Sequence, residues 1–379
     1  METELTQNKV EEARKNLIKV GEVLNRVLVG RTGEVEAVML ALVAREHVVL
    51  VGPPGTGKTM LAAALARLLG VRAYTALLTR YTTLDEVVGP INIPALRSGE
   101  VKRQWSHIVD SWLAFFDEIF KASPALLNAL LSLLNERVLY DPFTGMAIPA
   151  KLWTAVAASN EAPQDDELQA VYDRFAVKVF VKPLGNVDLM VKALEAKWLN
   201  GAEIKQVASP EDVATLHEYA VSLAPHALPL YRKHVMPLIQ LATSKGIFVS
   251  DRTAIEKLFK LFLAYLALHG AANDAVAIQA AVKLIRYVAR TPEELADLDR
   301  ALAEMFGKYM ELKKMLDDGK HLYDHGEHKE ALALFNKVAA YNVEELADKP
   351  WMKELIKPLM EEAQQYIQKI SRIRNGLRM

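Results

Sequence analysis

A glycine-rich run near the start of the chain has the residue types and spacing of a phosphate-binding loop. Residues 52–59 read Gly-Pro-Pro-Gly-Thr-Gly-Lys-Thr, between an apolar run at 48–51 and another at 60–66. These flanks predict a buried strand before the loop and a helix after it. Glycine lets the backbone turn tightly and aim its N–H groups inward, and the helix start adds a positive dipole. A glycine-rich turn without a ligand is the alternative, but the full match favours phosphate binding.

The loop is expected to contact both nucleotide and metal. Lys58 would reach the β- and γ-phosphates of ATP, and the Thr59 hydroxyl would ligate Mg²⁺. The expected nucleotide-binding residues are Gly52, Pro53, Pro54, Gly55, Thr56, Gly57, Lys58, Thr59 and Met60.

Three further polar residues follow apolar runs that are typical of buried strands. Residues 113–116 lead directly into Asp117 and Glu118, and residues 153–158 lead to Asn160. Open α/β sheets bind ligands at the carboxyl ends of their strands. We expect Asp117 to hold Mg²⁺ through water, Glu118 to polarise the attacking water, and Asn160 to orient the γ-phosphate or that water. The alternatives are a solvated acidic pair and a turn-forming asparagine.

The elements that must position these residues alternate between strand and helix. Strands are expected at 48–51, 73–78, 113–116, 153–158 and 177–181, and a helix at 8–28 carries apolar residues at spacings of three and four. This alternation predicts an α/β fold with a parallel sheet covered on both faces. From Pro183 onward the strand signals fade and helical periodicity takes over, with a helix restarting near Pro292.

Composition limits the class of protein. The 379 residues carry a net charge of -1, and 25% of them are charged. This balance weighs against a dedicated nucleic-acid binder. The absence of cysteine excludes disulfides and thiolate chemistry. Neither a signal-peptide pattern nor an apolar run long enough to cross a bilayer is present, so we expect a cytoplasmic protein without membrane insertion.

The ordered motifs resemble those of the AAA+ ATPases, and within them the MoxR group, with the RavA branch the most similar. The resemblance covers about residues 10 to 290 and rests on residues 52–59, 79–90, 116–122, 135–137, 157–161 and 172–175. It implies a P-loop NTPase (AAA+) αβα core at 1–184, with a hairpin inserted around 85–110. A helical lid at 185–300 and a C-terminal helical domain at 301–379 would follow. In the last of these, residues 319–332 weakly resemble a tetratricopeptide or MIT helix pair.

The resemblance also assigns roles to single residues. It places Asn160 at the sensor-1 position, Arg174 at the arginine finger that reaches a neighbour's nucleotide, and Arg252 at sensor 2. Arg137 is the second candidate for the finger. The alternatives are an Arg174 that pairs with Asp173 on the surface, and an Arg252 that is only a first-turn cation of a helix.

The inserted hairpin would project toward the axis of a ring. Its residues Lys102, Arg103, Trp105 and His107 would then be exposed to a partner or client, although a solvated loop with Trp105 in the core is an equal alternative.

The function that the resemblance implies is ATP hydrolysis coupled to remodelling, maturation or cofactor insertion in a client protein. It implies a homo-oligomer, with a hexameric ring expected, and a separate partner with a von Willebrand factor A (VWA) domain, because this chain has no such domain. Two alternatives stay open: an AAA+ motor or loader on nucleic acid, and a nucleotide-gated scaffold that hydrolyses negligibly.

Overall fold

A computed structural model of the chain describes residues 2–141, 144–163, 165–198, 204–324, 327–346 and 350–376. The sheets and helices below are those of these residues.

The strands of the main sheet are all parallel, in the order β2-β3-β6-β1-β7. Their bounds are β1 (Val48–Val51), β2 (Ala73–Leu77), β3 (Leu113–Asp117), β6 (Thr154–Ser159) and β7 (Val177–Phe180). Each expected strand is present, with ends that shift by a residue at most. The register pairs Val51 with Ser159 and Leu77 with Asp117, so the carboxyl ends of the strands meet at one edge.

Helices cover both faces of this sheet, which confirms the predicted α/β P-loop architecture. Residues of β1 alternate between two cores: Val48 and Leu50 face one, and Val49 and Val51 face the other. The helices are α1 (Glu2–Val27), α2 (Thr32–Ala44), α3 (Lys58–Leu69), α4 (Leu84–Val88), α5 (Ile93–Arg97), α6 (Pro124–Glu136), α7 (Asp166–Tyr172), α8 (Val187–Trp198), α9 (Pro210–Ser222), α10 (Ala224–Ser244), α11 (Leu258–His269), α12 (Asp274–Leu284), α13 (Pro292–Asp324), α14 (His328–Ala339) and α15 (Pro350–Gly376). Short helical turns are η1 (His107–Asp110), η2 (Ile119–Lys121), η3 (Thr253–Lys257), η4 (Ile285–Val288) and η5 (Val343–Leu346).

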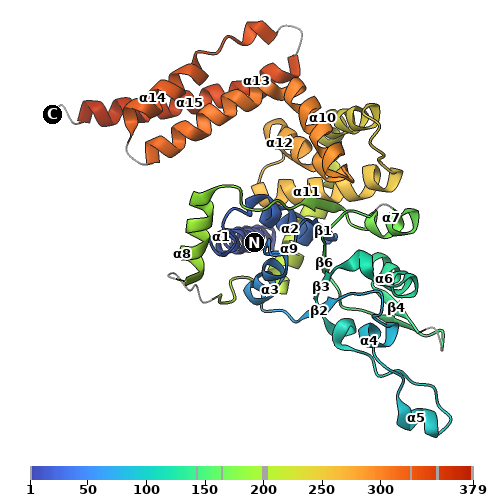
Figure 1. Cartoon of the computed structure of the whole chain (residues 1–379). Coiled ribbons are helices and arrows are strands. Elements are labelled where there is room, and N and C mark those ends of the chain that lie inside the picture. The colour runs from blue at the N-terminus through green and yellow to red at the C-terminus, as the bar shows by residue number, and fades with distance from the viewer. Residues whose placement is uncertain are drawn as a thin grey trace.

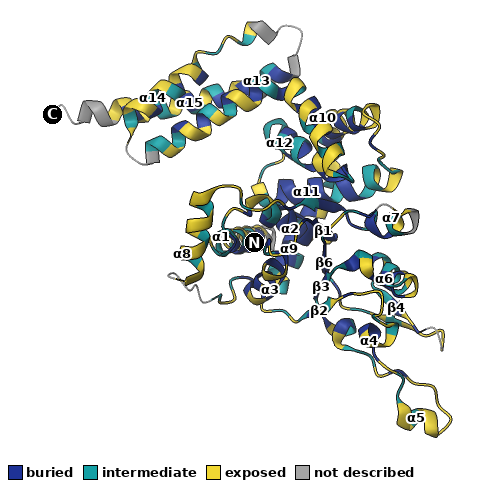
Figure 2. Cartoon of the chain, viewed as in Figure 1, coloured by how far each residue is buried: buried dark blue, intermediate teal, exposed yellow. Residues whose placement is uncertain are grey.

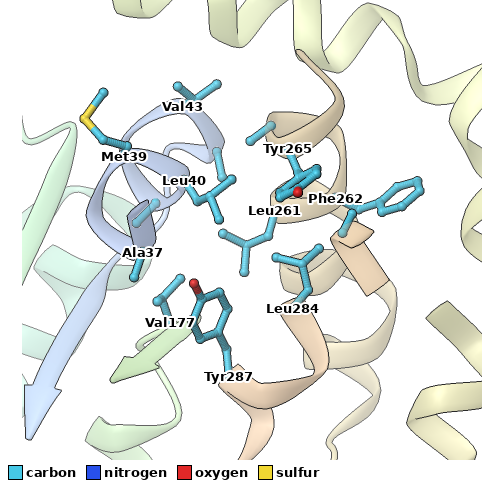
Figure 3. Close-up of a cluster of buried hydrophobic side chains, with 14 of the residues drawn as sticks. Ala37, Met39, Leu40, Val43, Val177, Leu261, Phe262, Tyr265, Leu284 and Tyr287 are labelled. Atoms are coloured by element: carbon cyan, nitrogen blue, oxygen red, sulfur yellow. The ribbon is translucent and has the colours of Figure 1, made fainter. Parts of the chain in front are cut away.

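The larger core joins the sheet to helices from the second half of the chain. Figure 3 shows Leu40 of α2 and Val177 of β7 facing Leu261 of α11, Leu284 of α12 and Tyr287 of η4. These side chains are buried, and the helices α2 and α11 are buried along most of their length (Figure 2). The helices expected to form the lid therefore share a core with the nucleotide-binding half.

The C-terminal helices α13 to α15 form an arm at the end of the molecule opposite α5 (Figure 1). Helix α13 begins at Pro292, where the sequence predicts a helix restart, and continues past the expected boundary at residue 300. The division of the chain into domains thus stays a prediction. Of the stretch 319–332 that resembles a repeat, residues 325 and 326 lie outside the described residues.

The inserted segment consists of two paired arms with a helical tip. Asn92 N–H donates to the Lys102 carbonyl at 2.7 Å and Ser106 N–H donates to the Val88 carbonyl at 2.8 Å, while α5 forms the tip. The expected exposure of Arg103 is wrong. Its guanidinium is buried, and it donates to Asp85 at 2.6 Å and to the Gly89 carbonyl. The charge can be buried because these acceptors replace the water around it.

A second, antiparallel hairpin lies beyond α6. It consists of β4 (Val138–Tyr140) and β5 (Ala147–Pro149).

Candidate functional site

The glycines of the phosphate-binding loop are required by its geometry. Gly52 follows β1, and its N–H donates to the Ser159 carbonyl at 2.9 Å. A Cβ at this position would lie 2.1 Å from the carbonyl oxygen of Val181, so no side chain fits. Gly55 and Gly57 have φ angles of 77° and 89°, in the left-handed region that favours glycine. The loop then enters α3 at Lys58, which leaves the first N–H groups of this helix directed at the loop.

Lys58 turns its ammonium group back over the loop. Its Nζ donates to the carbonyl oxygens of Gly52 at 2.6 Å and Pro53 at 2.9 Å. Burial lowers the pKa of Lys58, and the negative charges of Asp117 and Glu118 act in the opposite direction. Lys58 therefore lies near enough to both candidate carboxylates for their charges to act on it. The side chains of Thr59 and Met60, by contrast, are exposed.

The structure brings Asp117, Glu118 and Asn160 together at the ends of β3 and β6. Asp117 Oδ1 accepts from the backbone N–H of Glu118 at 3.1 Å. Glu118 has a φ of 53°, an uncommon value for a residue other than glycine. Asn160 Nδ2 donates to Glu118 Oε1 at 2.5 Å, and Lys121 Nζ lies 3.4 Å from the same oxygen.

The other carboxylate oxygen of Glu118 has a different environment. Oε2 is buried, and no group in the described part of the chain donates a hydrogen bond to it. A buried carboxylate oxygen without a donor is costly, because it has lost its water without a replacement. Glu118 thus has one oxygen fixed by an amide and one oxygen that can accept a proton or a hydrogen bond from a bound water.

A cleft of about 1210 Å³ lies beside the loop, between the end of α1 and α8. The loop residues 53–57 and Met60 form one wall, and Val27, Leu184 and Met190 add apolar surface. The cations that line the cleft are Arg26, Arg31, Lys192, Lys197 and Lys205.

Arg31 is a candidate that the sequence reasoning missed. Its Nη1 donates to the Lys182 carbonyl at 2.5 Å and lies 3.2 Å from Glu34, and its charge contributes to the lowered pKa of Lys58. In the sequence it follows the end of the first predicted helix, and no motif marks it.

Arg174 and Arg252 make their contacts, where the described residues show any, outside this group. The Nε of Arg174 is buried and has no hydrogen-bond partner among the described residues. Burial lowers the pKa of Arg174, and the positive charge of Arg252 lowers it further. Arg252 donates to Asn135 Oδ1 and to Glu256, both at 3.3 Å. No hydrogen bond or ion pair within the described ranges joins either arginine to the loop or to the carboxylates. The alternative pairing of Arg174 with Asp173 is not found among the described residues, where Asp173 pairs with Arg290 at 2.7 Å.

Arg137, the second finger candidate, is turned into the protein. It caps the end of α6, and its guanidinium donates to the carbonyls of Arg45 at 2.9 Å and Leu134 at 3.2 Å. Burial lowers its pKa. Its contacts are those of a structural cap. Of the two finger candidates, Arg174 is therefore the one whose guanidinium makes no hydrogen bond or ion pair among the described residues.

The fold and the loop define a P-loop nucleotide-binding protein. Residues 15–218 match a family described as the MoxR domain in the MoxR-vWA-beta-propeller ternary systems, which is more than half of the chain. The chain therefore belongs to the MoxR family of AAA+ ATPases. Its assignment to the RavA branch stays a prediction.

Individual relatives agree with this family. An uncharacterised protein of Methanocaldococcus jannaschii is 31% identical over 62% of this chain and 62% of its own length. Protein MoxR of Paracoccus denitrificans is 28% identical over 57% of this chain and 66% of its own. Chaperone MoxR1 of Mycobacterium tuberculosis is 25% identical over 55% of each. The matches thus cover between 55% and 66% of the length of these curated relatives.

A solved structure supports the fold alone. A Cytophaga hutchinsonii protein described as an ATPase candidate superposes with a TM-score of 0.61 at 17% identity, over 79% of this chain and 98% of that one. Among the described residues, none of the helices combines the length and the apolar character needed to span a membrane.

Proposed function

We propose that this protein hydrolyses ATP and uses the energy to remodel partner proteins. The proposal rests on the hydrogen bond from Asn160 to Glu118, close to Lys58. The second carboxylate oxygen of Glu118 has no donor among the described residues and can accept a hydrogen bond from a water molecule. A glutamate that orients the attacking water and an amide that positions it are what phosphoryl transfer to water needs.

The residues of the loop hold the substrate. Lys58 would exchange its two carbonyl partners for phosphate oxygens, and the N–H groups at the start of α3 would bind the same phosphates. The apolar wall at Val27, Leu184 and Met190 suits the base. Thr59 and Asp117 would hold magnesium, whose charge offsets that of the phosphates during transfer.

A neighbouring copy of the chain would complete the site with Arg174. Among the described residues this guanidinium makes no hydrogen bond or ion pair, and so none with the subunit's own loop. An arginine supplied from a neighbour stabilises the charge that develops on the transferred group and contributes roughly 10³ to 10⁵ in rate. We therefore propose a ring, with six subunits as the expected number. Arg252, which lies beside Arg174, would face the same neighbour.

The family and its relatives support the coupling to other proteins. The matched family is described by systems that combine MoxR with vWA and β-propeller proteins, and one relative is named a chaperone. A separate VWA-domain protein is thus the proposed partner, and a protein client is the proposed substrate of remodelling.

Three variants test the hydrolytic site. Lys58→Ala should lose nucleotide binding, because phosphate charge is left uncompensated, whereas Glu118→Gln should bind ATP and hydrolyse it about 10²- to 10⁴-fold more slowly. Arg174→Ala should bind nucleotide and lose activity. The measurements are binding of a fluorescent nucleotide and steady-state phosphate release. Equal rates in the parent and all variants would refute the site.

Assembly is tested separately. Light scattering of the Glu118→Gln protein with ATP and Mg²⁺ should give the mass of six subunits, and a monomer under all conditions would refute the ring. Mixing Lys58→Ala with Arg174→Ala subunits should restore activity, because each supplies what the other lacks. The control is scattering of the mixture, which must show that mixed rings form.

A further inference from the structure

The turn that carries Arg174 is held by groups from distant parts of the chain. Helix α7 ends at Tyr172, and Asp173 follows as its cap. Arg290 Nη2 donates to Asp173 Oδ2 at 2.7 Å, and the Tyr172 hydroxyl donates to the Arg290 carbonyl at 3.1 Å. Lys257 Nζ donates to the Asp173 carbonyl oxygen. The residue just before Arg174 is therefore bonded through both its side chain and its backbone.

The other side of the turn is fixed by a buried lysine. Lys178 on β7 donates to the Phe175 carbonyl at 3.3 Å, and its ammonium lies 5.2 Å from the centre of the Tyr172 ring. That ring also meets Phe120, which follows Glu118 by two residues, edge to face at 5.5 Å. Tyr172 and Phe175 are fully buried. The backbone on both sides of Arg174 thus has little freedom.

Two of the residues that contact Asp173, Lys257 and Arg290, lie outside the nucleotide-binding core expected at residues 1–184. Lys257 is the last residue of η3, a π-helical turn that begins directly after Arg252. At this turn Arg252 lies on the surface, whereas Lys257 is only 3% exposed. Arg290 lies between η4 and α13, where its backbone N–H donates to Glu294 at 2.6 Å.

We propose that Arg290 and Lys257 are positioning residues for Arg174, acting through Asp173. This inference rests on the proposed role of Arg174 at a neighbour's site. A guanidinium that must reach across a subunit boundary works only if its backbone is held in place beforehand, because a misplacement of about 1 Å costs roughly 10²-fold in rate. The contacts place that control in the helical half of the chain, at η3 and at the start of α13.

The test compares two arginines of the same junction. Arg286, four residues before Arg290, forms a 2.7 Å ion pair with Asp299 of α13 and does not contact Asp173. Arg286→Ala therefore loosens the junction without releasing the turn. We expect Arg290→Ala to lower kcat at least about 10-fold with KM within about threefold of the parent, and Arg286→Ala to leave both near parental values. Equal losses in the two variants would overturn the proposal.

A second variant guards against a folding defect. Asp173→Ala keeps the backbone cap and the backbone acceptor for Lys257 but removes the carboxylate that accepts from Arg290. It should therefore reproduce the kcat of Arg290→Ala with parental thermal unfolding. Parental kcat in Asp173→Ala would contradict a positioning role.

The decisive readout is non-additivity. If Arg290 acts through Arg174, adding Arg290→Ala to Arg174→Ala should cause no further loss of kcat. A further 10-fold loss would overturn the proposal and show a separate effect of Arg290. A loss in Arg174→Ala with none in Arg290→Ala would overturn the positioning role alone. Parental kcat in Arg174→Ala would overturn the proposed trans finger as well.

Discussion

A buried histidine at the start of β1 makes the protein less stable in acid. His47 is 1% exposed and directly precedes β1. Its Nδ1 accepts from the Ala155 N–H at 2.9 Å, so the ring proton lies on Nε2, which donates to the Leu134 carbonyl at 2.7 Å. Burial, followed by the charge of Arg137, lowers the pKa of His47 to about 3 from 6.5. The ring is therefore neutral in the folded protein.

The sign of the pH effect follows from these two pKa values. Between pH 6.5 and pH 3 the unfolded chain binds a proton at this residue and the folded chain does not, so the free energy of unfolding rises with pH across this window. Lowering the pH from about 7.5 to about 5 should remove about 2 kcal/mol of stability through this group alone.

The perturbation that isolates this group is His47→Gln. Glutamine does not titrate, and it keeps a donor for Leu134 while losing the acceptor for Ala155. We expect the variant to be less stable than the parent by about 1–2 kcal/mol at pH 7.5 and nearly equal to it at pH 5.

The assay is urea unfolding followed by far-ultraviolet circular dichroism at both pH values. The quantity of interest is the parent-to-variant difference, because other groups titrate equally in both proteins. His226→Gln, at an exposed histidine, serves as the control and should show no pH-dependent difference. A parent-to-variant gap in His47→Gln that stays constant between pH 7.5 and pH 5 would refute the reasoning.

Three further changes have expected outcomes. Gly52→Ala should abolish binding of a fluorescent nucleotide and lower the melting temperature, since its Cβ would lie 2.1 Å from the Val181 carbonyl. Lys178→Met should raise stability in urea unfolding, and by about 3 kcal/mol more at pH 6 than at pH 9. The reason is that burial lowers the pKa of Lys178 to about 7, so the penalty for its charge fades as the pH rises from 7 to 10.5. Asn160→Asp should reduce kcat at pH 7 about 10²-fold or more and move the pH–kcat profile, because a second carboxylate would lie 2.5 Å from Glu118 Oε1. An unchanged profile would remove Asn160 from the site.

Local patterns in the sequence determined the nucleotide-binding half. The glycines of the loop, the apolar runs before Asp117 and Asn160, and the alternation of strand with helix are short-range signals that the structure follows closely. The sequence predicts a parallel sheet but not the order of its strands. The pairing of β3 with β6, which brings Glu118 and Asn160 together, is seen only in the structure.

Only the tertiary structure decided how the arginines are used. Arg103, Arg137 and Arg174 look alike in the sequence, because each follows or precedes a turn and carries the same charge. In the structure Arg103 is buried and pairs with Asp85 of the same inserted segment, and Arg137 donates to backbone carbonyls that include that of Arg45. Arg174 has no partner in the described residues. Two further contacts join residues more than 100 positions apart. Arg31 donates to the Lys182 carbonyl beside the cleft, and Arg290 donates to Asp173, the residue before Arg174. A single contact between distant residues produces no periodic pattern in one sequence, because any lysine or arginine with a long enough side chain can make it.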